Sequence, residues 1–501
     1  MNKKFILYAA IFFCCIQFCH SQKQNNFWSF GHKAAINFNG SFPVADSSSV
    51  ISRGSCASVC DTNGQLLFYV SYDPTVLIGG TDPVKIHDKT HSVMQNGNYL
   101  KGGGWYNEIT IVSFPDLPNL YYVLYAGVTL DYGLWYSIVD INQNGGLGSV
   151  TQKNIQLQNF KATDGLTAIK HGNGRDWWII SRRWDYVSDE FYVYLVDPSG
   201  ISGPLIQHSG TATDNGFYRM LFNSTGNKLI CVDYRSLVEE FSFDRCTGII
   251  TLDRTIHPET IAPFPAYVGC ALSSNDRYLY ISSNEDTSYL LQLDLQDPLT
   301  WDNQDTLWSF DTFASAGGLL KLAPDKKIYF SCAWYDGVNF NYPYPDSVFN
   351  MYNNNLSVIN YPDSPGVACG FAPFSFNLGA GRTYWGLPNN PDYELGPDTN
   401  SMCDTVLSVD SRPLTVDRNS QLHVFYHPGW QIAFINAEGL RGKTYTLCVM
   451  DLSGRIVYRE EGKLSPPYFT KDLSFGEYSG GIYIVRLQTE REVLSNKFLK
   501  E

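Results

Sequence analysis

The chain has 501 residues, of which 44% are hydrophobic and 15% aromatic, so it is a globular protein long enough for more than one domain. Its formal net charge of −13, with no run of lysine or arginine, argues against nucleic acid or an anionic membrane as the main partner.

Residues 1–21 have the composition of a secretory signal peptide. Lys3 and Lys4 precede an apolar run from Phe5 to Phe18, and small or polar residues follow near Ser21. The run is too short for a membrane-spanning helix of ~20 residues, and no later segment is apolar enough for one. We therefore expect export without a transmembrane segment.

A strand pattern repeats along most of the chain. The stretch 268–295 holds three apolar runs rich in β-branched and aromatic residues, separated by Ser-Ser-Asn-Asp and Ser-Asn-Glu-Asp-Thr-Ser. The last apolar residue before the first turn recurs at a step of 50 residues, with looser copies upstream at steps of 53 to 57. These anchor residues are Val59, Val112, Ile169, Phe222, Leu272 and Leu322.

A repeat of about 40 to 50 residues with four strands is typical of a β-propeller blade, because such a sheet buries both faces only by stacking radially on its neighbours. The sequence therefore predicts an all-β fold in which residues 27–387 form a propeller. The last repeat is predicted to supply only an innermost strand at 371–378, with outer strands from 27–31 and 34–38. This closure gives seven blades, with six or eight left open.

Several short motifs in this region resemble the propeller that precedes adhesion-type and gliding-motility-associated modules in large exported proteins of gliding Gram-negative bacteria. The resemblance implies a surface or secreted protein and carries over no catalytic residue. The motifs are Trp28-Ser-Phe-Gly31, Ile36-Asn-Phe-Asn39, the run from Cys56 to Tyr69, Gly145-Gly-Leu-Gly148, Asp176-Trp-Trp-Ile179, Phe191-Tyr-Val-Tyr194, Leu322-Ala-Pro-Asp325 and Gly386-Leu-Pro-Asn389.

Residues 388–416 are poor in apolar pattern and are predicted to form a linker. Alternating apolar runs follow in 417–501 and predict a small C-terminal β-sandwich.

The C-terminal region also resembles the type A C-terminal sorting domain of the type IX secretion system, through Met450-Asp-Leu-Ser-Gly-Arg455, Ser479-Gly-Gly-Ile-Tyr-Ile-Val-Arg486 and Asn496-Lys-Phe-Leu-Lys500. The Tyr-Pro-Asn-Pro usual at the start of that domain is replaced here by Phe425-Tyr-His-Pro428. The resemblance implies the type IX machinery as a partner. It also implies a secreted or outer-surface location after transit through the periplasm.

Nine of the 12 cysteines lie beyond the predicted signal peptide, and an odd number leaves at least one thiol unpaired. Cys56 and Cys60 are ~13 Å apart on an extended strand, which is beyond disulfide reach. Cys231, Cys270 and Cys332 lie in apolar strand runs, as does Cys448, and are expected to be small core residues.

No motif predicts a catalytic residue, a cofactor or a metal site. Gly442-Lys-Thr444 ends like a phosphate-binding loop but lacks its first glycine and leads into a strand. The segment 140–151 begins like a calcium loop but has Thr151 in place of the bidentate glutamate. His87 and His91 have a helical metal-ligand spacing without a helix.

The loops that join the second and third strands of each blade are expected to share one face of the ring and to carry recognition. Two of them are rich in aromatic and charged residues, and we expect them to lie side by side on one rim. Aromatic rings supply stacking area, and charged groups orient hydroxyls or carboxylates. The candidate binding residues are Arg182, Arg183, Trp184 and Asp185 on one loop, and Trp334, Tyr335, Asp336, Tyr342 and Tyr344 on the other. The alternative is that the second loop only covers the channel and that Arg183 pairs with Asp185 in solvent.

Three function classes follow. The leading hypothesis is a secreted or surface-displayed propeller that binds a polysaccharide or a surface protein. The second is a propeller-type glycosidase or lyase, which would require aspartate and glutamate from different blades to converge at the channel mouth. The third is a structural component of a surface or motility apparatus.

Overall fold

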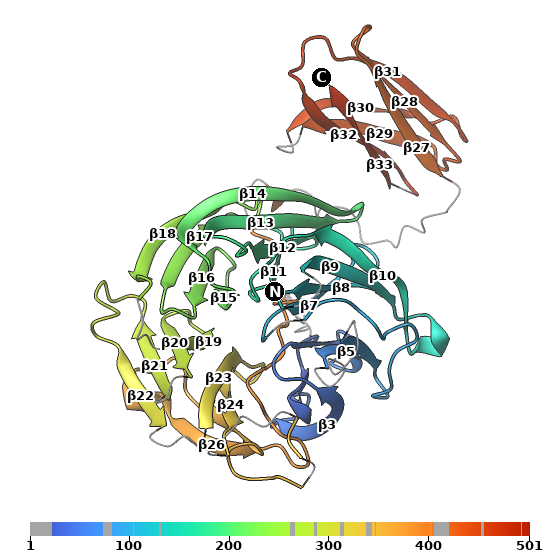
Figure 1. The fold of residues 1–501 in the computed structure, drawn as a ribbon. Helices are drawn as coiled ribbons and strands as arrows, with labels where there is room; N and C mark the ends of the chain where they lie inside the picture. The colour runs from blue at the N-terminus through green and yellow to red at the C-terminus, as the bar shows by residue number, and fades with distance from the viewer. Residues whose placement is uncertain are drawn as a thin grey trace, which may run out of the picture. The chain divides into compact units, whose positions relative to one another are not determined.

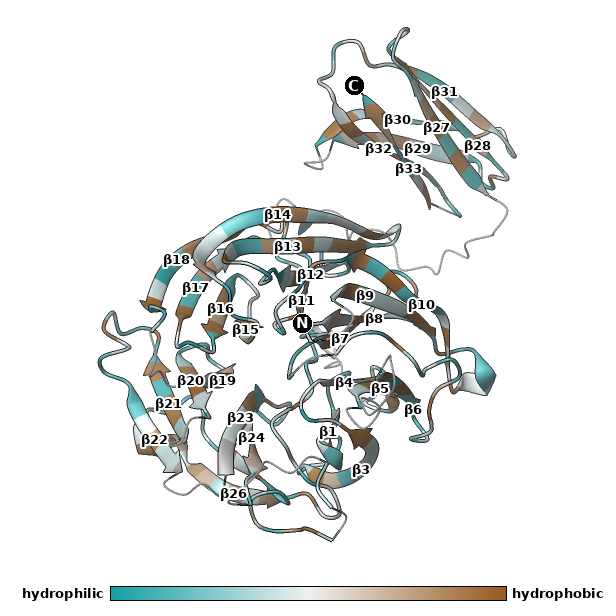
Figure 2. Cartoon of the chain, in the orientation of Figure 1, coloured by the Kyte–Doolittle hydropathy of each residue, from teal (hydrophilic) through white to brown (hydrophobic). Residues whose placement is uncertain are grey.

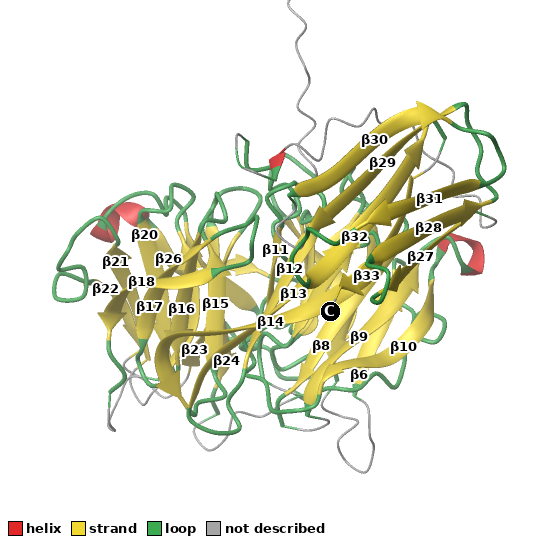
Figure 3. Cartoon of the chain, turned by 90° about the horizontal axis from the view of Figure 1, so that it is seen from above, coloured by secondary structure: helices red, strands yellow, loops and turns green. Residues whose placement is uncertain are grey.

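The computed structural model of the chain is almost entirely β (Figures 1 and 3). Two compact units are formed by residues 1–404 and 405–501. In the described part of the chain no helix is long and apolar enough to span a membrane. The predicted signal peptide lies outside the described residues. These are 23–73, 83–103, 105–129, 132–260, 266–284, 288–310, 315–336, 343–345, 347–399, 401, 403–404, 420–451, 455–491 and 493–500.

The first unit is a ring of sheets, seven of which are formed by described residues (Figure 1). Two are three-stranded, with β1 Phe27–Phe30, β2 His32–Asn37 and β3 Val44–Ile51 in one, and β4 Cys56–Cys60, β5 Leu66–Tyr72 and β6 Val84–Asp88 in the other. The third contains β7 Ile109–Ser113, β8 Leu120–Gly127, β9 Gly133–Asp140 and β10 Ser149–Gln158. The fourth contains β11 Thr167–Lys170, β12 Trp177–Arg182, β13 Ser188–Asp197 and β14 Gly200–Thr213.

Three further four-stranded sheets complete the ring. They contain β15 Tyr218–Phe222, β16 Lys228–Asp233, β17 Val238–Phe243 and β18 Ile250–His257; β19 Tyr267–Leu272, β20 Tyr278–Ser283, β21 Ser288–Asp294 and β22 Asp305–Phe310; and β23 Ser315–Leu322, β24 Ile328–Trp334, β25 Asn355–Ile359 and β26 Phe371–Asn377. Short 3₁₀ helices occur at Asn144–Gly146 and Gly366–Cys369.

The repeat found in the sequence corresponds to the blades. Each anchor residue, from Val59 to Leu322, lies in the first strand of a different sheet, and these strands are innermost (Figure 1). Inner strands such as β12 are buried along their whole length, whereas the outermost strands β14 and β18 are largely polar and exposed (Figure 2). Burial from both faces therefore explains the continuous apolar runs of the inner strands.

The ring closes differently from the sequence prediction. The strand β26, predicted as the innermost strand of the last blade, is instead the outermost strand of the blade β23–β26. The N-terminal strands β1–β3 form a sheet of their own, which a backbone bridge between His32 and Arg382 ties to the end of the ring, with both hydrogen bonds at 2.8–2.9 Å. Trp28 of β1 also packs edge-on against Tyr329 of β24, at 5.9 Å between ring centroids. The prediction of the last blade was thus wrong in its strand composition, although the N-terminal strands do complete the ring.

Residues 386–398, here called the axial segment, run along the innermost strands at the centre of the ring (Figure 1). The Asn389 amide donates to the carbonyls of Asn107 and Leu166, at 2.9 and 2.8 Å, and its backbone N–H donates to Cys56. The carbonyl of Asn390 accepts from Lys321 of β23. Since these partners come from four blades, the axial segment ties the inner ends of these blades together. The predicted linker therefore begins too early, because residues 388–391 are buried in the propeller.

The axial segment ends in a clamp at one face of the ring, here called the exit face. Arg245, in the β17–β18 turn, donates to the carbonyl of Gly396 at 2.6 Å, and the N–H of Asp398 donates to Gly172 at 2.8 Å. A disulfide joins Cys246 to Cys403, with 5.6 Å between their Cα atoms. The chain is thus covalently fixed to the propeller one residue before the first unit ends.

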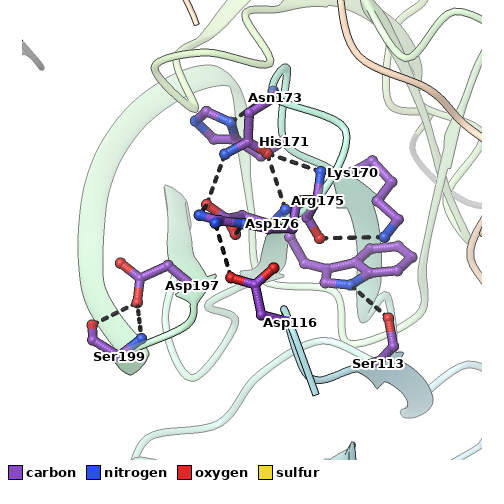
Figure 4. Close-up of polar contacts among 10 residues, drawn as sticks. Ser113, Asp116, Lys170, His171, Asn173, Arg175, Asp176, Asp197 and Ser199 are labelled. Atoms are coloured by element: carbon purple, nitrogen blue, oxygen red, sulfur yellow. Dashed lines mark hydrogen bonds and ion pairs between the residues drawn. The ribbon is translucent and has the colours of Figure 1, made fainter. Parts of the chain in front are cut away.

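A polar network makes the β11–β12 turn of this clamp rigid (Figure 4). The carboxylate of Asp176 accepts hydrogen bonds from Asn173 and Arg175, both at 2.7 Å, and Arg175 also pairs with Asp116 of the neighbouring blade at 3.0 Å. The ring of His171 contacts the carbonyl of Cys246 at 3.1 Å. The turn therefore links two blades and the disulfide.

The other described cysteines, seven in number, are free thiols, and those in the propeller are buried. These include Cys56 and Cys60, and also Cys231, Cys270 and Cys332, as the sequence predicted.

The second unit is a β-sandwich of a three-stranded and a four-stranded sheet that enclose one apolar core. The ammonium group of Lys500, near the C-terminus, is buried and donates to the carbonyls of Phe475 and Tyr478. The strands are β27 Gln421–His427, β28 Ile432–Glu438 and β31 Phe469–Ser474 in one sheet, and β30 Ile456–Lys463, β29 Thr444–Asp451, β32 Gly481–Thr489 and β33 Val493–Lys500 in the other.

Candidate binding face at the propeller mouth

One face of the ring, here called the mouth, carries both the loops between second and third strands and the connections between blades. Backbone hydrogen bonds join the two kinds of loop: Trp184 donates to Lys161 at 3.1 Å, and Tyr234 donates to Phe217 at 3.2 Å. The shared face follows from antiparallel pairing, because a second strand ends where the first strand of its blade begins. The mouth is therefore opposite the exit face.

Arg182 is not available at this surface. Its side chain is fully buried, and the guanidinium lies between the rings of Phe191 and Tyr218, at 5.1 and 4.6 Å from their centroids. It donates to the Tyr218 hydroxyl and to the carbonyl of Ser188 at 3.2 Å. Arg182 is thus a structural link between two blades, and its prediction as a binding residue is wrong. The sequence did not reveal this because an arginine at the end of a strand is usually solvated.

Arg183 and Asp185 form the ion pair that the alternative interpretation predicted. Nε of Arg183 lies 2.7 Å from the Asp185 carboxylate, and the guanidinium also lies over the rings of Phe160 and Tyr186. Hydrogen bonding to Asp185 is the main cause that raises the pKa of Arg183. The pair is at the surface, where such contacts contribute little to stability.

The two candidate loops lie on opposite sides of the mouth. Trp184 belongs to the blade β11–β14 and Trp334 to the blade β23–β26, with two blades between them on one side and three on the other. The prediction that the loops are neighbours is therefore wrong. Tyr344 is buried, and its hydroxyl accepts from the Trp334 N–H at 3.1 Å. Tyr342 lies outside the described residues.

Tyr335 is half-buried and Asp336 is exposed on the Trp334 loop. This loop therefore leaves polar and aromatic surface on the mouth even though Tyr344 is removed from it.

A continuous row of aromatic rings crosses the mouth and connects the two loops. Successive ring centroids are 3.8 to 6.1 Å apart, within the range of favourable aromatic contacts. The middle of the row is buried and its two ends are half-buried. In order, the rings are Trp184, Trp105, Phe217, Tyr106, Trp385, Tyr384, Tyr344 and Trp334.

One end of the row forms a half-buried surface, here called the mouth patch, made of Trp105, Trp184, Phe217 and Tyr234. Trp105 stacks on Phe217 with centroids 3.8 Å apart, and Phe217 stacks on Tyr234 at 5.0 Å. Beneath the two tryptophans lies Gly216, where a Cβ atom would stand 2.8 Å from the Trp105 ring and 2.9 Å from that of Trp184. A residue without a side chain is therefore required for the two rings to come together.

Two carboxyl groups from neighbouring blades converge below the mouth patch. Glu108 precedes β7 and is 1% exposed, and Asp164 precedes β11 and is 2% exposed. The Glu108 carboxylate accepts from the Tyr106 N–H at 3.1 Å and from the Ser55 hydroxyl, and Asp164 accepts from the Tyr218 N–H at 2.7 Å.

Asp164 also lines a small cavity with Asn107, Tyr106, Phe217 and Arg219. The space accommodates about one water molecule.

Burial governs the ionisation of both acids. It raises the pKa of Glu108 to about 7, partly offset by the Ser55 hydroxyl. Burial, and then the nearby Glu108, raise the pKa of Asp164 well above its ordinary value. Buried carboxyl groups with raised pKa values are common in acid–base catalysis. Here, however, both groups already accept hydrogen bonds from donors of neighbouring blades, Ser55 for Glu108 and the Tyr218 N–H for Asp164, in a space too small for a substrate.

Glu108 and Asp164 belong to no recognisable motif and are not among the residues predicted for the site. A signal was present: Ser55, Glu108 and Asp164 stand four or five positions before the anchors Val59, Val112 and Ile169. Alignment of the repeats on their anchors would have placed them together at the mouth. Among the described residues, no cluster of three histidine, cysteine, aspartate or glutamate side chains is arranged to hold a metal ion.

Comparisons with known proteins bear on the two units separately. Residues 424–501 match the family described as the secretion system C-terminal sorting domain. No curated protein matches the chain.

Three solved structures are similar to the chain. A putative 6-phosphogluconolactonase from Bacteroides fragilis is 12% identical, with 67% of this chain and 89% of that chain covered and a TM-score of 0.41. The β-propeller domain of Cps50 from Myceliophteria thermophila is 9% identical, with 62% and 90% covered and a TM-score of 0.36. The periplasmic gluconolactonase of Pseudomonas aeruginosa is 12% identical, with 79% and 96% covered and a TM-score of 0.34. Similarity at this level does not bear on function.

The seven sheets and the matched C-terminal unit together agree with the resemblances found in the sequence. The chain is an exported β-propeller protein whose C-terminal sorting domain directs it through the type IX secretion system to the cell surface or the medium.

Proposed function

We propose that the propeller is a binding module that holds a polysaccharide on its mouth patch. The observation that carries this proposal is the stacked, half-buried group of Trp105, Trp184, Phe217 and Tyr234, contributed by four separate loops. Such rings offer flat apolar faces with polar edges and lose little conformational entropy on binding. The C–H face of a pyranose ring is complementary to them.

The little enclosed space among the described residues of the mouth supports a polymer over a small ligand. The axial segment runs through the centre of the ring, and the cavity beside Asp164 accommodates about one water molecule. A ligand therefore has to lie across the mouth. An extended sugar chain gains contact area in this way, whereas a metabolite-sized ligand normally requires a concave site of several hundred cubic ångströms.

The alternative is a propeller-type hydrolase or lyase that uses Glu108 and Asp164. Their convergence from two blades favours it, and their 1–2% exposure opposes it. Variants at Glu108 separate the two functions, because a binding module keeps its ligand when this carboxylate becomes an amide. Loss of polymer cleavage in Glu108→Gln, with retention unchanged, would establish the enzyme.

Retention on immobilised polysaccharides tests the proposal. Trp184→Ala removes one ring of the mouth patch, and Gly216→Ala displaces two rings without removing either. We expect each to weaken retention about tenfold or more, since stacking and desolvation are both lost. Tyr361→Ala is the matched control, because this tyrosine is 66% exposed on the loop between β25 and β26, at the exit face.

If the folded Trp184→Ala and Gly216→Ala variants are retained on the polysaccharide as well as the intact protein, the mouth patch is not the binding site. Retention on an envelope protein, lost in the same variants, would replace the polysaccharide by a protein ligand. Trp334→Ala tests separately whether the far end of the aromatic row takes part.

A further inference from the structure

A lysine stands between two aromatic rings at the edge of the mouth patch. Nζ of Lys161 lies 4.6 Å from the ring centroid of Tyr132 and 5.2 Å from that of Trp184. These residues come from three different loops, and Lys161 precedes β11 in the connection from β10. The side chain of Lys161 is half-buried, and Tyr132 is 44% exposed. The ammonium group is thus held at the surface by ring faces, as in a cation–π contact.

Among the described residues, Lys161 makes no ion pair. The nearby acids are engaged elsewhere: Asp185 pairs with Arg183 at 2.7 Å, and Glu190 accepts from the hydroxyls of Tyr186 and Tyr192, both at 2.9 Å. The ammonium group therefore keeps hydrogen-bonding capacity for a ligand beside the exposed Tyr132 and the half-buried Trp184. In a chain with a net charge of −13, such a cation orients an anion locally and does not attract anions in general.

We infer that this corner of the mouth, defined by Tyr132, Lys161 and Trp184, is a subsite for a uronate residue of an acidic polysaccharide. The inference rests on the proposed function and specifies its ligand. The sugar ring stacks on Trp184, which continues into the mouth patch through Trp105 at 6.1 Å, and its carboxylate pairs with Nζ of Lys161. Charge-assisted hydrogen bonds of this kind are short and strong compared with neutral ones.

The test uses polygalacturonate and its methyl ester as ligands, because esterification removes the charge and keeps the sugar rings. We expect the intact protein to bind the uronate form more tightly than the ester. Lys161→Gln should weaken binding of the uronate about tenfold and leave binding of the ester unchanged. Lys101→Gln is the matched control, because its Nζ also lies 5.2 Å from a tryptophan ring, that of Trp135.

The outcomes separate the inference from the proposed function. If Trp184→Ala abolishes retention while Lys161→Gln binds the uronate as the intact protein does, the uronate subsite is overturned and the mouth patch stands. Equal binding of the uronate and the ester by the intact protein also overturns the subsite. If Trp184→Ala has no effect on any polysaccharide that the intact protein holds, the proposed function fails as well.

Discussion

Trp105 and Phe217 stack face to face, with ring centroids 3.8 Å apart, although the blades they precede are separated by a third. Trp105 precedes β7 and Phe217 precedes β15, so the stack spans the start of β11. Contacts of this kind join blades that share no hydrogen-bonded strand edge. The mouth is therefore a packed surface, and substitutions there are expected to affect both ligand retention and stability, which have to be measured separately.

The axial segment approaches β4 so closely that it requires glycine at one position. A Cβ atom on Gly386 would lie 2.0 Å from the carbonyl oxygen of Gly54, whereas one on Gly396 would meet nothing within 4 Å. We expect Gly386→Ala to destabilise the propeller by about 3 kcal/mol and Gly396→Ala to have little effect. Chemical denaturation of the two variants checks this, and equal midpoints would mean that the axial segment is not packed as described.

The disulfide between Cys246 and Cys403 closes a loop with a sequence separation of 157 residues. Constraint of so long a loop in the unfolded chain predicts a stabilisation of about 2 to 5 kcal/mol. Thermal unfolding of a Cys246→Ser, Cys403→Ser double variant should show this loss, while Cys448→Ser, a free thiol in the other unit, should leave the propeller unchanged. An unchanged unfolding temperature in the double variant would contradict the clamp.

The buried Glu108 predicts a dependence of stability on pH. Its pKa is raised by burial from 4.5 to about 7, so within this window the folded chain holds a proton that the unfolded chain has released. The folded state is then favoured at the acidic end, and stability falls as pH rises through the window, by on the order of 3 kcal/mol at most. Asp164, whose pKa is also raised, acts in the same direction.

Unfolding temperatures measured from pH 4.5 to 7.5 check this prediction. Glu108→Gln should flatten the profile, and Asp302→Asn, at an exposed position, should not. Two groups act in the opposite direction: burial lowers the pKa of His87 from 6.5 to about 4 and that of Lys321 from 10.5 to about 7, so each raises stability as pH rises between its two values. The contribution of Glu108 is therefore the difference between the profiles of the intact protein and Glu108→Gln. A slope as steep in Glu108→Gln as in the intact protein would assign the pH dependence to other groups, such as Asp164.

Deletion of residues 24–43 removes β1 and β2 and with them the bridge from His32 to Arg382. Because ring closure buries the sheet faces of the first and last blades against each other, we expect the entire propeller to lose stability, and not only its first blade. Hydrogen exchange resolved by segment distinguishes these cases. Protection lost only near β3 and β4 would show that the blades unfold independently.

Removal of all residues after 404 deletes the sorting domain and retains the disulfide. We expect a folded propeller that accumulates in the periplasm and binds its polysaccharide as the full chain does, because the sorting domain is a separate compact unit. Cell fractionation checks the periplasmic location, and retention assays check polysaccharide binding. Delivery of this shortened protein to the cell surface would mean that the propeller carries an export signal of its own.

The blades were predictable from the sequence because the inner strands of every blade are buried on both faces and therefore repeat the same apolar pattern. The anchors Phe222, Leu272 and Leu322 recur at 50 residues since each ends an innermost strand before a tight turn. The strand β26 was misplaced because an apolar stretch such as 371–378 has the same pattern as an outer or an inner strand. Only the pairing of β26 with β25 decides between them.

The candidate site was predictable only in part. Strand–loop alternation placed Trp184 and Trp334 on the mouth, but the distance between them depends on ring closure, a property of the whole domain. Burial of Arg182 depends on Tyr218, which belongs to the next repeat and lies 36 residues later. Residues 388–398 of the axial segment fall in the predicted linker because their turn-forming residues lack apolar periodicity, while their hydrogen bonds come from asparagine side chains.

The axial segment also determines when the propeller is able to fold. Its contacts with β4, β7 and β23 come from the last residues of the first unit, so the centre of the ring stays hollow until nearly all of that unit has been synthesised. Contacts of such long sequence separation form slowly, because the closure entropy has to be overcome before they become favourable. During export from the N-terminus, the propeller is therefore an incomplete ring until the axial segment has crossed the inner membrane. The disulfide that fixes this segment forms only after residue 403 has crossed as well.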